Sequence, residues 1–582
     1  MMNAITTKQR ALLAADTDRT QDYVFESARL PEIRGASVIL RDLNEQGAPE
    51  LIRNLDGTAK EIYAAGGGLL YEVDATQAPA IQQALESLYP EKTGVATITC
   101  VYRELPDEVN AGIKHTPLNL GALEGLEFSA FQRERLKMTD RDLDCFGAWV
   151  RLLGHDLRRR KQEKRYVPFV EAPPHARRCQ SCRIRPASAV SPHYEEPMFL
   201  CTECGRKSAY SERFPWRDKF DRKLGKYHPQ LAEGYFAEAK QGAIPVDIKV
   251  IASACKPRNR NKNGYVAFIY ADGDGVGSFV ESRRTQDDYR KMSKDLRDAT
   301  WYAVSFALAR NLAIQALDNP MSAEETEEQR KRPTQPFEII TIGGDDVMLI
   351  VPAHVALQVA RDMAEKFTEY LEKRNIRGKD RPLTLSAGVV IAPQHMPVRL
   401  LRDFARTLLK EGAKPRAKET EFAAVDFQIF TSTAVYGSDI MDMRARPPYS
   451  VTPRGQSNDK PLRLYHRPYT IPELNKLLDA LKALNSTDFP TSQLHQLAGV
   501  LERGRRRATL FYLYQRSRVQ NKQHRAALAK VEKIIEAQEP RDPLPWYKAD
   551  PKATYTFSAT LRDVAELYDF VPSPESQKGV TA

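Results

Sequence analysis

The chain has 582 residues, and 87 lysines and arginines against 76 aspartates and glutamates give it a net charge of +11. Its hydrophobic content of 42% is that of ordinary globular proteins, which excludes a disordered chain. No apolar run reaches the roughly 18 residues of a membrane-spanning helix, the first residues hold no signal-peptide core, and seven cysteines are too few for a disulfide scaffold. The sequence therefore predicts a cytoplasmic protein of several domains with no membrane partner.

The N-terminal region predicts a β-α-β-β-α-β unit. An apolar strand that ends in Asp16-x-Asp18 is followed by a helical stretch and by the hairpin Glu61–Asp74. A short helix over Ala78–Leu88 and a strand over Val95–Glu104 complete the order. This order is the ferredoxin-like arrangement.

Positive charge is concentrated in two windows. Arg151–Arg185 holds eleven lysines and arginines against three acidic residues, and Gln496–Lys530 holds nine against one. Solvated helix faces would explain either window alone. Together they favour a nucleic-acid or ribonucleoprotein partner, because clustered cations attract polyanions.

Four cysteines follow the first basic window. Cys179-x-x-Cys182 and Cys201-x-x-Cys204 are separated by 18 residues, which is the spacing of a four-thiolate zinc site. Such a site is closed, so we expect Zn²⁺ to have a structural role. A redox role is the less favoured alternative.

The segment Gly264–Pro393 predicts a second unit with the same order of elements. An apolar strand over Gly264–Ala271 runs into the turn ADGDGVG, and a long helix follows a few residues later. EETEEQRKRPTQ is predicted to be a charged loop. Two strands, Phe337–Ile342 and Val347–Pro352, flank Gly343-Gly344-Asp345-Asp346 as a hairpin, and an amphipathic helix and the strand Leu383–Pro393 complete the unit.

The two units are interpreted as an internal duplication. Asp16 and Asp18 of the first correspond to Asp272 and Asp274 of the second, and Gly66-Gly67-Gly68 is placed where the second has Gly343-Gly344-Asp345. The first unit lacks the carboxylate pair at its hairpin. We therefore expect it to be non-catalytic and either to bind a nucleotide or to pack against the second unit.

The carboxylates of the second unit predict an ion site. The topology brings Asp272 and Asp274 near Asp345 and Asp346, and clustered carboxylates repel one another unless a cation neutralises them. Oxygen ligands suit Mg²⁺ or Mn²⁺, and two such ions support phosphoryl or nucleotidyl transfer.

Glycines of the same two turns suit a nucleotide. Gly273, Gly275 and Gly277, with Ser278 beside them, let backbone N–H groups approach phosphates at the start of a helix. Gly343 and Gly344 leave room for a base or ribose at the hairpin. The alternative for either turn alone is an ordinary surface turn.

After the Pro-rich stretch Arg446–Gly455, interpreted as a linker, the sequence is mostly helical. The arginines at 503 and 505–507 are candidate contacts for RNA or an acidic partner, while Phe511, Tyr512 and Tyr514 are predicted to be core residues. The predicted fold class is thus α+β multidomain, with two ferredoxin-like domains, a zinc-binding insertion and an α-helical C-terminal domain. The expected boundaries are 1–165, 166–245, 246–445 and 446–582.

The motif IGGDDVMLIVP resembles the GGDD signature of the type III CRISPR effector large subunit, the Cas-ten family. YADGDGVGSF, LSAGVVIAP with LLRDFARTLLKEGAK, the four cysteines between the two units and the helical C-terminus are similar to that family as well. The resemblance covers essentially the whole chain.

The resemblance implies palm folds in both units, with two ATP molecules held between them. It implies that the second unit links ATP into oligoadenylates, usually cyclic, within a complex of other effector subunits, crRNA and target RNA. Asp272, Asp345 and Asp346 match the family's metal-binding positions, and Lys414 looks like its phosphate-contacting lysine. An exposed lysine at a helix end is the alternative for Lys414.

Many relatives carry an HD nuclease domain, and this chain has the dipeptide His155-Asp156. It lies in a basic helical stretch without further ligands nearby in the sequence, so no metal-dependent DNase activity is expected. Two other function classes compete with the synthetase: a non-catalytic scaffold subunit with a vestigial palm, and a stand-alone GGDD nucleotide cyclase. The intact DGDG and GGDD motifs argue against the first, and the zinc cluster and second palm argue against the other.

Overall fold

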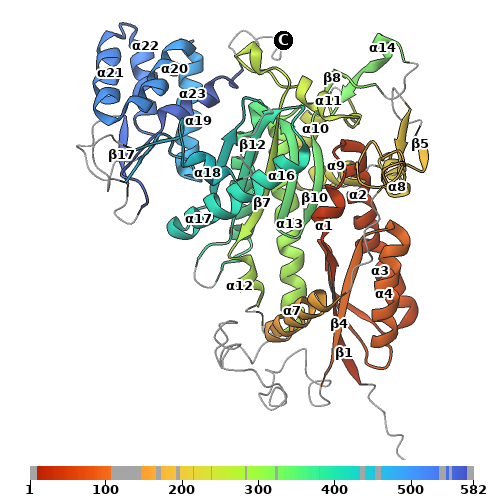
Figure 1. Cartoon of the computed structure of the whole chain (residues 1–582). Helices are drawn as coiled ribbons and strands as arrows, with labels where there is room; N and C mark the ends of the chain where they lie inside the picture. The colour runs from red at the N-terminus through yellow and green to blue at the C-terminus, as the bar shows by residue number, and fades with distance from the viewer. Residues whose placement is uncertain are drawn as a thin grey trace, which may run out of the picture.

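The computed structural model describes most of the chain. The described residues are 9–105, 146–164, 172–191, 197–213, 215–237, 239–281, 283, 285–320, 325–378, 381–432, 439–452, 460–535, 545–549 and 553–572. Figure 1 shows three regions: an N-terminal sheet with its helices, a larger central sheet, and a group of C-terminal helices beside it. Within the described residues, no helix is long and apolar enough to cross a membrane.

The first unit has the predicted order of elements, and its strands form one antiparallel sheet in the order β2-β3-β1-β4. Its α-helices α2 and α4 cover one face of this sheet, where the buried residues of β1 are Ala11, Leu13 and Ala15. The elements of the first unit are β1 (Arg10–Asp18), α1 (Thr20–Val24), α2 (Leu30–Asp42), α3 (Ala48–Leu55), β2 (Lys60–Ala65), β3 (Gly68–Asp74), α4 (Ala78–Thr93) and β4 (Thr97–Glu104).

The other face of the first sheet is covered by α7 (Phe146–Glu163), which carries the first part of the predicted basic window. Trp149 and Leu153 of α7 pack on Leu12 and Ala14 of β1. The apolar side of this helix therefore lies on the sheet, while Arg158 and Arg159 in its basic run are exposed.

A four-cysteine module follows, and it packs on the first unit through α8 and α2. Gly35 of α2 is pressed against the backbone of Lys207 so closely that an added β-carbon would lie 1.7 Å from its carbonyl oxygen. The elements between the two units are β5 (Ala189–Ser191), β6 (Met198–Leu200), α8 (Thr202–Tyr210), α9 (Pro215–Tyr227), α10 (Pro229–Tyr235) and α11 (Ile248–Ser253).

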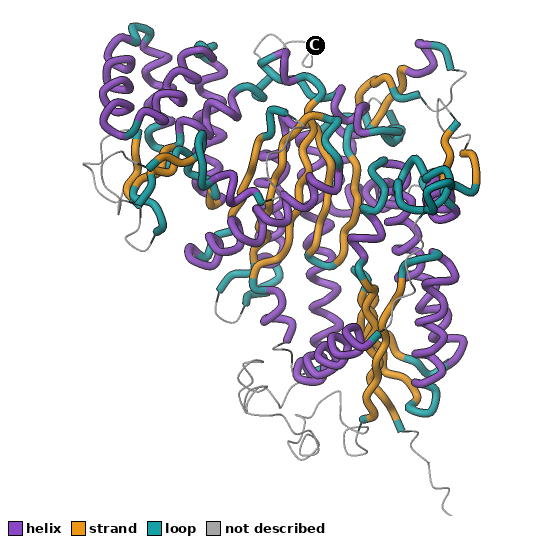
Figure 2. Tube along the Cα trace, in the orientation of Figure 1, coloured by secondary structure: helices purple, strands orange, loops and turns teal. Residues whose placement is uncertain are grey.

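The second unit repeats the order of the first in a six-stranded sheet, β10-β11-β7-β12-β13-β16. Figure 2 shows this sheet at the centre of the molecule. Helices α13 and α15 pack together on one face of it. The elements are β7 (Tyr265–Asp274), α12 (Val276–Glu281), α13 (Gln286–Asn311), β8 (Gln315–Asp318), α14 (Glu327–Arg330), β9 (Lys331–Thr334), β10 (Glu338–Gly343), β11 (Asp346–Pro352), α15 (Ala356–Lys373), β12 (Thr384–Pro393), α16 (Val398–Thr407), α17 (Lys414–Thr420) and β13 (Ala424–Ile429).

The prediction of a charged loop over residues 324–335, after α13, is wrong in part. Thr326 caps α14 with a capping box, and β9 pairs with β8 in an antiparallel hairpin. Alternating charged residues hide this hairpin in the sequence, because neither strand has the apolar periodicity of a buried element.

The sequence predicts a helical C-terminal region, and the structure corrects this because the region contains strands as well as helices. A small sheet, β14-β15-β18-β17, accompanies its helices, and β16 joins the sheet of the second unit by pairing with β13. Part of the predicted linker is thus strand β14. The elements are α18 (Ile440–Arg444), β14 (Ser450–Val451), β15 (Leu462–Arg463), β16 (Tyr469–Thr470), α19 (Ile471–Ser486), α20 (Thr491–Val500), α21 (Arg505–Arg518), α22 (Lys522–Val531), β17 (Trp546–Lys548), β18 (Phe557–Ala559) and α23 (Leu561–Tyr568).

The two units are joined by buried polar contacts between α2 and the edge strand β10. Arg34 binds Glu338 through two hydrogen bonds of 2.9 and 2.6 Å and donates a third, also 2.6 Å long, to the Pro245 carbonyl. Ser37 donates to the Ile340 carbonyl, and the Trp216 indole donates to Ser37. These contacts fix the face of the second sheet against the first unit.

Candidate active site

Three of the predicted carboxylates lie at one end of the adjacent strands β7 and β11 of the second sheet. Val347 of β11 pairs with Ala271 of β7, so Asp346 and Asp272 occupy the next positions on adjacent strands. Asp345 lies in the turn, and one of its carboxylate oxygens would be 2.5 Å from a β-carbon added to Gly273. The hairpin of the GGDD motif is confirmed, and it brings the predicted aspartates together.

The electrostatics of this group favour a bound cation. Burial and the nearby charge of Asp272 raise the pKa of Asp345 to about 6. The same causes, with the added charge of Asp345, raise the pKa of Asp346 to about 8. Oδ1 of Asp346 is buried without a hydrogen-bond partner. Hard oxygen ligands with unsatisfied charge are the donor set that Mg²⁺ or Mn²⁺ prefers.

The three carboxylates do not form a tight cage by themselves. Among the described residues, only the four cysteines form a group of three or more metal-ligating residues whose ligand atoms lie within 4.8 Å of one another. A wider arrangement suits Mg²⁺, which usually takes one or two carboxylates together with water and substrate phosphates.

Lys414 supplies the positive charge nearest to this group. It is the first residue of α17, and its Nζ contacts Asp272 and donates to the Gly273 carbonyl at 3.1 Å. A π-helix over Leu408–Ala413 leads into it, and such irregular turns often occur at functional sites. The lysine is thus directed into the site and is not an exposed side chain at a helix end.

Asp274 is placed differently from the other carboxylates. It is buried and accepts hydrogen bonds from Thr384 at 2.9 Å and from Ser386 at 2.6 Å. Burial raises its pKa, against these two hydrogen bonds and the charge of Lys414. Its carboxylate is taken up by these two hydroxyls and supports the end of β7 against β12.

Metal-free protein is expected to lose stability as the pH rises from about 4 to about 8. Between the ordinary pKa of 3.8 and the raised pKa values of about 6 and about 8, folded Asp345 and Asp346 keep protons that the unfolded chain releases. The folded state then binds more protons, so its stability falls with rising pH. Thermal unfolding in a chelator at pH 6 and pH 8 measures this loss. Mg²⁺ should restore the lost stability at pH 8 in the native protein. It should not stabilise Asp346→Asn, because the uncharged side chain removes the repulsion that the ion would neutralise. Equal stabilisation of the native protein and of Asp346→Asn by Mg²⁺ would contradict the assignment.

The first unit has the same geometry without the carboxylate pair. Asp16 pairs with Gly68 across β1 and β3, at the register that Asp272 and Asp346 hold in the second unit. Gly66-Gly67-Gly68 therefore corresponds to Gly344-Asp345-Asp346. The predicted alignment with Gly343-Gly344-Asp345 is wrong by one residue, and glycine replaces both hairpin aspartates.

Two lysines that were not predicted as site residues neutralise the aspartates of the first unit. Lys161 of α7 binds Asp16 at 2.6 Å and Asp18 at 3.1 Å, and Lys164 binds Asp18 at 3.1 Å. Burial raises the pKa of Asp18, but hydrogen bonds from Thr97 and Thr99 and the charge of Lys164 together lower it. The sequence shows these lysines only as members of the first basic window. Their ion pairs could not be predicted, because they depend on how α7 packs on the sheet.

A cavity of about 300 Å³ lies between the two units. Its wall includes Asp346 and Gly343 from the second unit and Asp16, Gln21 and Gly67 from the first, with Asn44, Arg41 and Trp216 among the others. Asp272 and Asp345 are not among the lining residues. Gln21 donates to the Tyr270 hydroxyl at 2.9 Å, and Tyr270 lies close enough to Asp346 for the two side chains to interact.

The two hairpin turns touch at this cavity. A β-carbon on Gly343 would lie 2.7 Å from Cα of Gly66, so neither turn has room for a side chain at this contact. Gly344 has φ +68°, a left-handed conformation that favours glycine. Gly275, with φ +77°, and Gly277 and Ser278 lie at the start of α12; the Ser278 hydroxyl donates to the Gly275 carbonyl at 3.1 Å.

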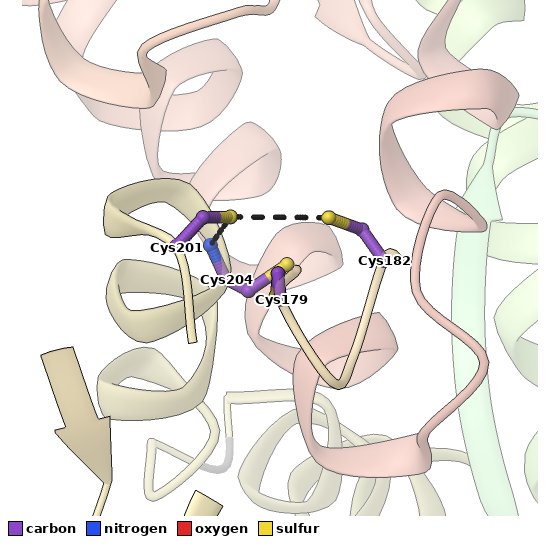
Figure 3. A group of neighbouring side chains, drawn as sticks. All are labelled: Cys179, Cys182, Cys201 and Cys204. Atoms are coloured by element: carbon purple, nitrogen blue, oxygen red, sulfur yellow. Dashed lines mark hydrogen bonds between the residues drawn. The ribbon is translucent and has the colours of Figure 1, made fainter. Parts of the chain in front are cut away.

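The four cysteines converge, as the spacing predicts. Cys179, Cys182, Cys201 and Cys204 are buried, and their sulfur atoms point toward one another (Figure 3). The Cys182 and Cys201 sulfurs are 3.9 Å apart, close to the roughly 3.8 Å edge of a tetrahedral zinc site with 2.3 Å Zn–S bonds. The Cys204 N–H donates to the Cys201 sulfur, which caps α8. The residues thus fit a closed structural zinc site.

Cys182→Ser is expected to remove the bound zinc and to melt the module at lower temperature. Structural zinc supplies folding free energy to a module whose buried cluster consists of little besides the cysteines. Metal analysis of the purified protein, alongside a thermal melt, gives both readouts. Cys255→Ser is a matched control, since this buried thiol is not part of the cluster; zinc-free native protein would refute the assignment.

The structure places the His155-Asp156 dipeptide in an ion-paired part of α7, and it changes one other prediction, on α21. His155 of α7 is 3.7 Å from Asp156, whose carboxylate binds Arg103. On α21, Tyr512 is buried, but Tyr514 is 53% exposed, so its prediction as a core residue is wrong.

One family model matches the chain. Residues 265–423, which hold the aspartates, the glycine turns and Lys414, match the model described as Cas10/Cmr2, second palm domain. No curated protein matches the chain.

Several solved structures share the fold at low identity. Csm1 of T. onnurineus is 12% identical with a TM-score of 0.51, covering 97% of this chain and 70% of that chain. A Csm1–Csm4 cassette in complex with cA3 is 13% identical with a TM-score of 0.51, covering 97% and 69%. A cassette in complex with one ATP is 12% identical with a TM-score of 0.50, covering 97% and 70%. Residues 265–423 are therefore similar to the second palm domain of Cas10/Cmr2, and the chain shares the fold of these Csm1 structures.

Proposed function

We propose that the chain is the large subunit of a type III CRISPR RNA-guided effector complex and that its second unit joins ATP molecules into oligoadenylate, usually cyclic, when target RNA is bound. One observation carries the proposal. Asp272, Asp345 and Asp346 gather beside a cavity between two units, inside the segment that matches the Cas10/Cmr2 second palm, and burial together with the charge of Asp272 raises the pKa values of Asp345 and Asp346.

These three aspartates would hold Mg²⁺ or Mn²⁺, which supplies activation of the attacking hydroxyl and stabilisation of the leaving oxygen. Lys414, which contacts Asp272, is oriented to offset phosphate charge at the same end of β7. Because Gly273 has no side chain, the Asp345 carboxylate can occupy the space beside it.

ATP is the proposed occupant of the cavity. Gly343 lines the cavity and is proposed to contact the nucleotide through its backbone, because Gly66 fills its side-chain position, and Gly344 is proposed to leave room for the base or ribose at the hairpin. Gly275, Gly277 and Ser278 are proposed phosphate contacts at the start of α12. Both units are proposed to be ferredoxin-like palms, of which the first forms a non-catalytic wall. Its aspartates are already neutralised by Lys161 and Lys164.

The proposed partners are other effector subunits, crRNA and target RNA. The second basic window supports a polyanion or subunit contact: α21 combines exposed Leu510, Leu513 and Tyr514 with a run of arginines. Solved relatives include Csm1–Csm4 cassettes. We also propose the division into domains at 1–165, 166–245, 246–445 and 446–582, a structural Zn²⁺ in the second of them, and no HD-type DNase activity from this chain.

Mass spectrometry of the products from ATP with Mg²⁺ or Mn²⁺ tests the proposal. The assembled effector is compared with and without target RNA. Adenylate products that require target RNA support the synthetase. A complex that binds its target but forms no product favours the scaffold, and products from the chain alone without RNA favour a stand-alone cyclase.

A further inference from the structure

The four-cysteine module is connected to the inter-unit cavity through α1 and the residues that follow it. Thr20, Gln21, Val24 and Phe25 line the cavity. The other side of the same segment faces the module. Five residues of helix and a short loop therefore separate the cysteine cluster from the proposed nucleotide site.

Lys207 of α8 makes the central contact. Its side chain is fully buried, and its Nζ donates to the Tyr23 carbonyl at 2.8 Å and to Glu26 at 3.0 Å. The ammonium also lies 4.0 Å from the centre of the Tyr23 ring. A lysine is almost never fully buried unless it is paired, so its partners on the α1 segment account for its position.

Two contacts from the cysteine loops hold the same segment. Ser181, between Cys179 and Cys182, is 2.5 Å from the Ser27 hydroxyl. Arg185 binds the second carboxylate oxygen of Glu26 at 2.5 Å. The loop that would close on zinc and the helix that follows it thus both bind residues 23–27.

We propose that Lys207 is a positioning residue through which the folded four-cysteine module sets the wall of the nucleotide cavity, so that loss of zinc or of Lys207 weakens nucleotide binding. The proposal rests on the proposed function in taking ATP as the occupant of the cavity. Gln21 transmits the position of α1 directly, because it hydrogen-bonds the Tyr270 that contacts Asp346.

The test compares Lys207→Met, Glu26→Gln and the control Arg206→Met in the full chain. Arg206 lies beside Lys207 on α8, but its hydrogen bonds go to the Glu91 and Lys92 carbonyls at the end of α4. Three quantities are measured for each variant: zinc content, hydrogen exchange of residues 20–29, and calorimetric affinity for ATP with Mg²⁺. Glu26→Gln preserves size and hydrogen bonding, so it covers the case in which Lys207→Met does not fold.

Lys207→Met is expected to keep its zinc, to raise hydrogen exchange at residues 20–29 and to weaken ATP binding about tenfold, a usual size for coupling between two sites. Glu26→Gln should also raise hydrogen exchange at residues 20–29 and weaken ATP binding, but by smaller amounts. Arg206→Met should leave both the exchange and the ATP affinity unchanged. Removing zinc from the native protein with a chelator should reproduce the effect of Lys207→Met.

Unchanged exchange at residues 20–29 in Lys207→Met and Glu26→Gln would overturn the inference, and so would native ATP affinity despite faster exchange. A native protein that binds no ATP would instead overturn the proposed function. The exchange measurement separates the two failures, because it reports the link between module and α1 without nucleotide.

Discussion

Asp345→Asn/Asp346→Asn is expected to lower oligoadenylate formation by about a thousandfold or more, the loss that follows removal of a principal electrostatic group from an active site. Asparagine keeps the size of both side chains, so the hairpin between β10 and β11 should stay folded. The two substitutions remove the charges that, with Asp272, are proposed to hold the divalent ions. Product formation is measured by mass spectrometry with the target-bound effector, and ATP-independent target binding confirms assembly.

Asp16→Asn is the matched control in the first unit. Asp16 holds the position of Asp272 on β1, but its partners are Lys161 and a glycine hairpin. Its replacement should reduce product formation by less than about tenfold, which corresponds to 1.4 kcal/mol. Equal losses at the two sites, with folding intact, would contradict a single catalytic unit.

Arg34→Met is expected to destabilise the folded chain by about 3–5 kcal/mol, because it leaves Glu338 charged and buried without its partner. The side chains of Arg34 and Glu338 are 6% and 5% exposed, and they join α2 to β10 across the two units. Denaturant-induced unfolding measures the loss.

The double variant Arg34→Met/Glu338→Leu separates the ion pair from the cost of a single unpaired charge. It should recover most of the lost stability, since an apolar pair of similar volume often replaces a buried ion pair at little cost. If the double variant is less stable than Arg34→Met, the unpaired Glu338 is not the cause of the lost stability. The loss would then come from the unsatisfied Pro245 carbonyl and the altered packing.

Much of the site could be predicted because its chemistry is local in sequence. The GGDD turn lies between two apolar strands, and the two Cys-x-x-Cys pairs have zinc spacing, so both were found without long-range information. The register of the glycine turn in the first unit could not be predicted in this way. Three consecutive glycines offer no side chain to align, and only the pairing of Asp16 with Gly68 fixes which of them replaces which aspartate.

Residues that act through tertiary packing were missed for a different reason. Lys161 and Lys164 were visible only as part of a basic window, since their partners on β1 are more than a hundred residues away. The strands β14–β18 have two or three residues each, too few for an alternating pattern to stand out. They form because the neighbouring helices bury them.

The central sheet also has consequences for how other chains can approach it. A strand at a sheet edge presents unpaired backbone groups that invite another chain to add a strand. On one edge, α2 packs along β10, and Ser37 takes up the Ile340 carbonyl. On the other edge, β16 is two residues long and runs directly into α19. Within the described residues, both edges of this sheet are therefore protected from edge-to-edge aggregation, and another chain would have to approach the sheet through its helices and loops.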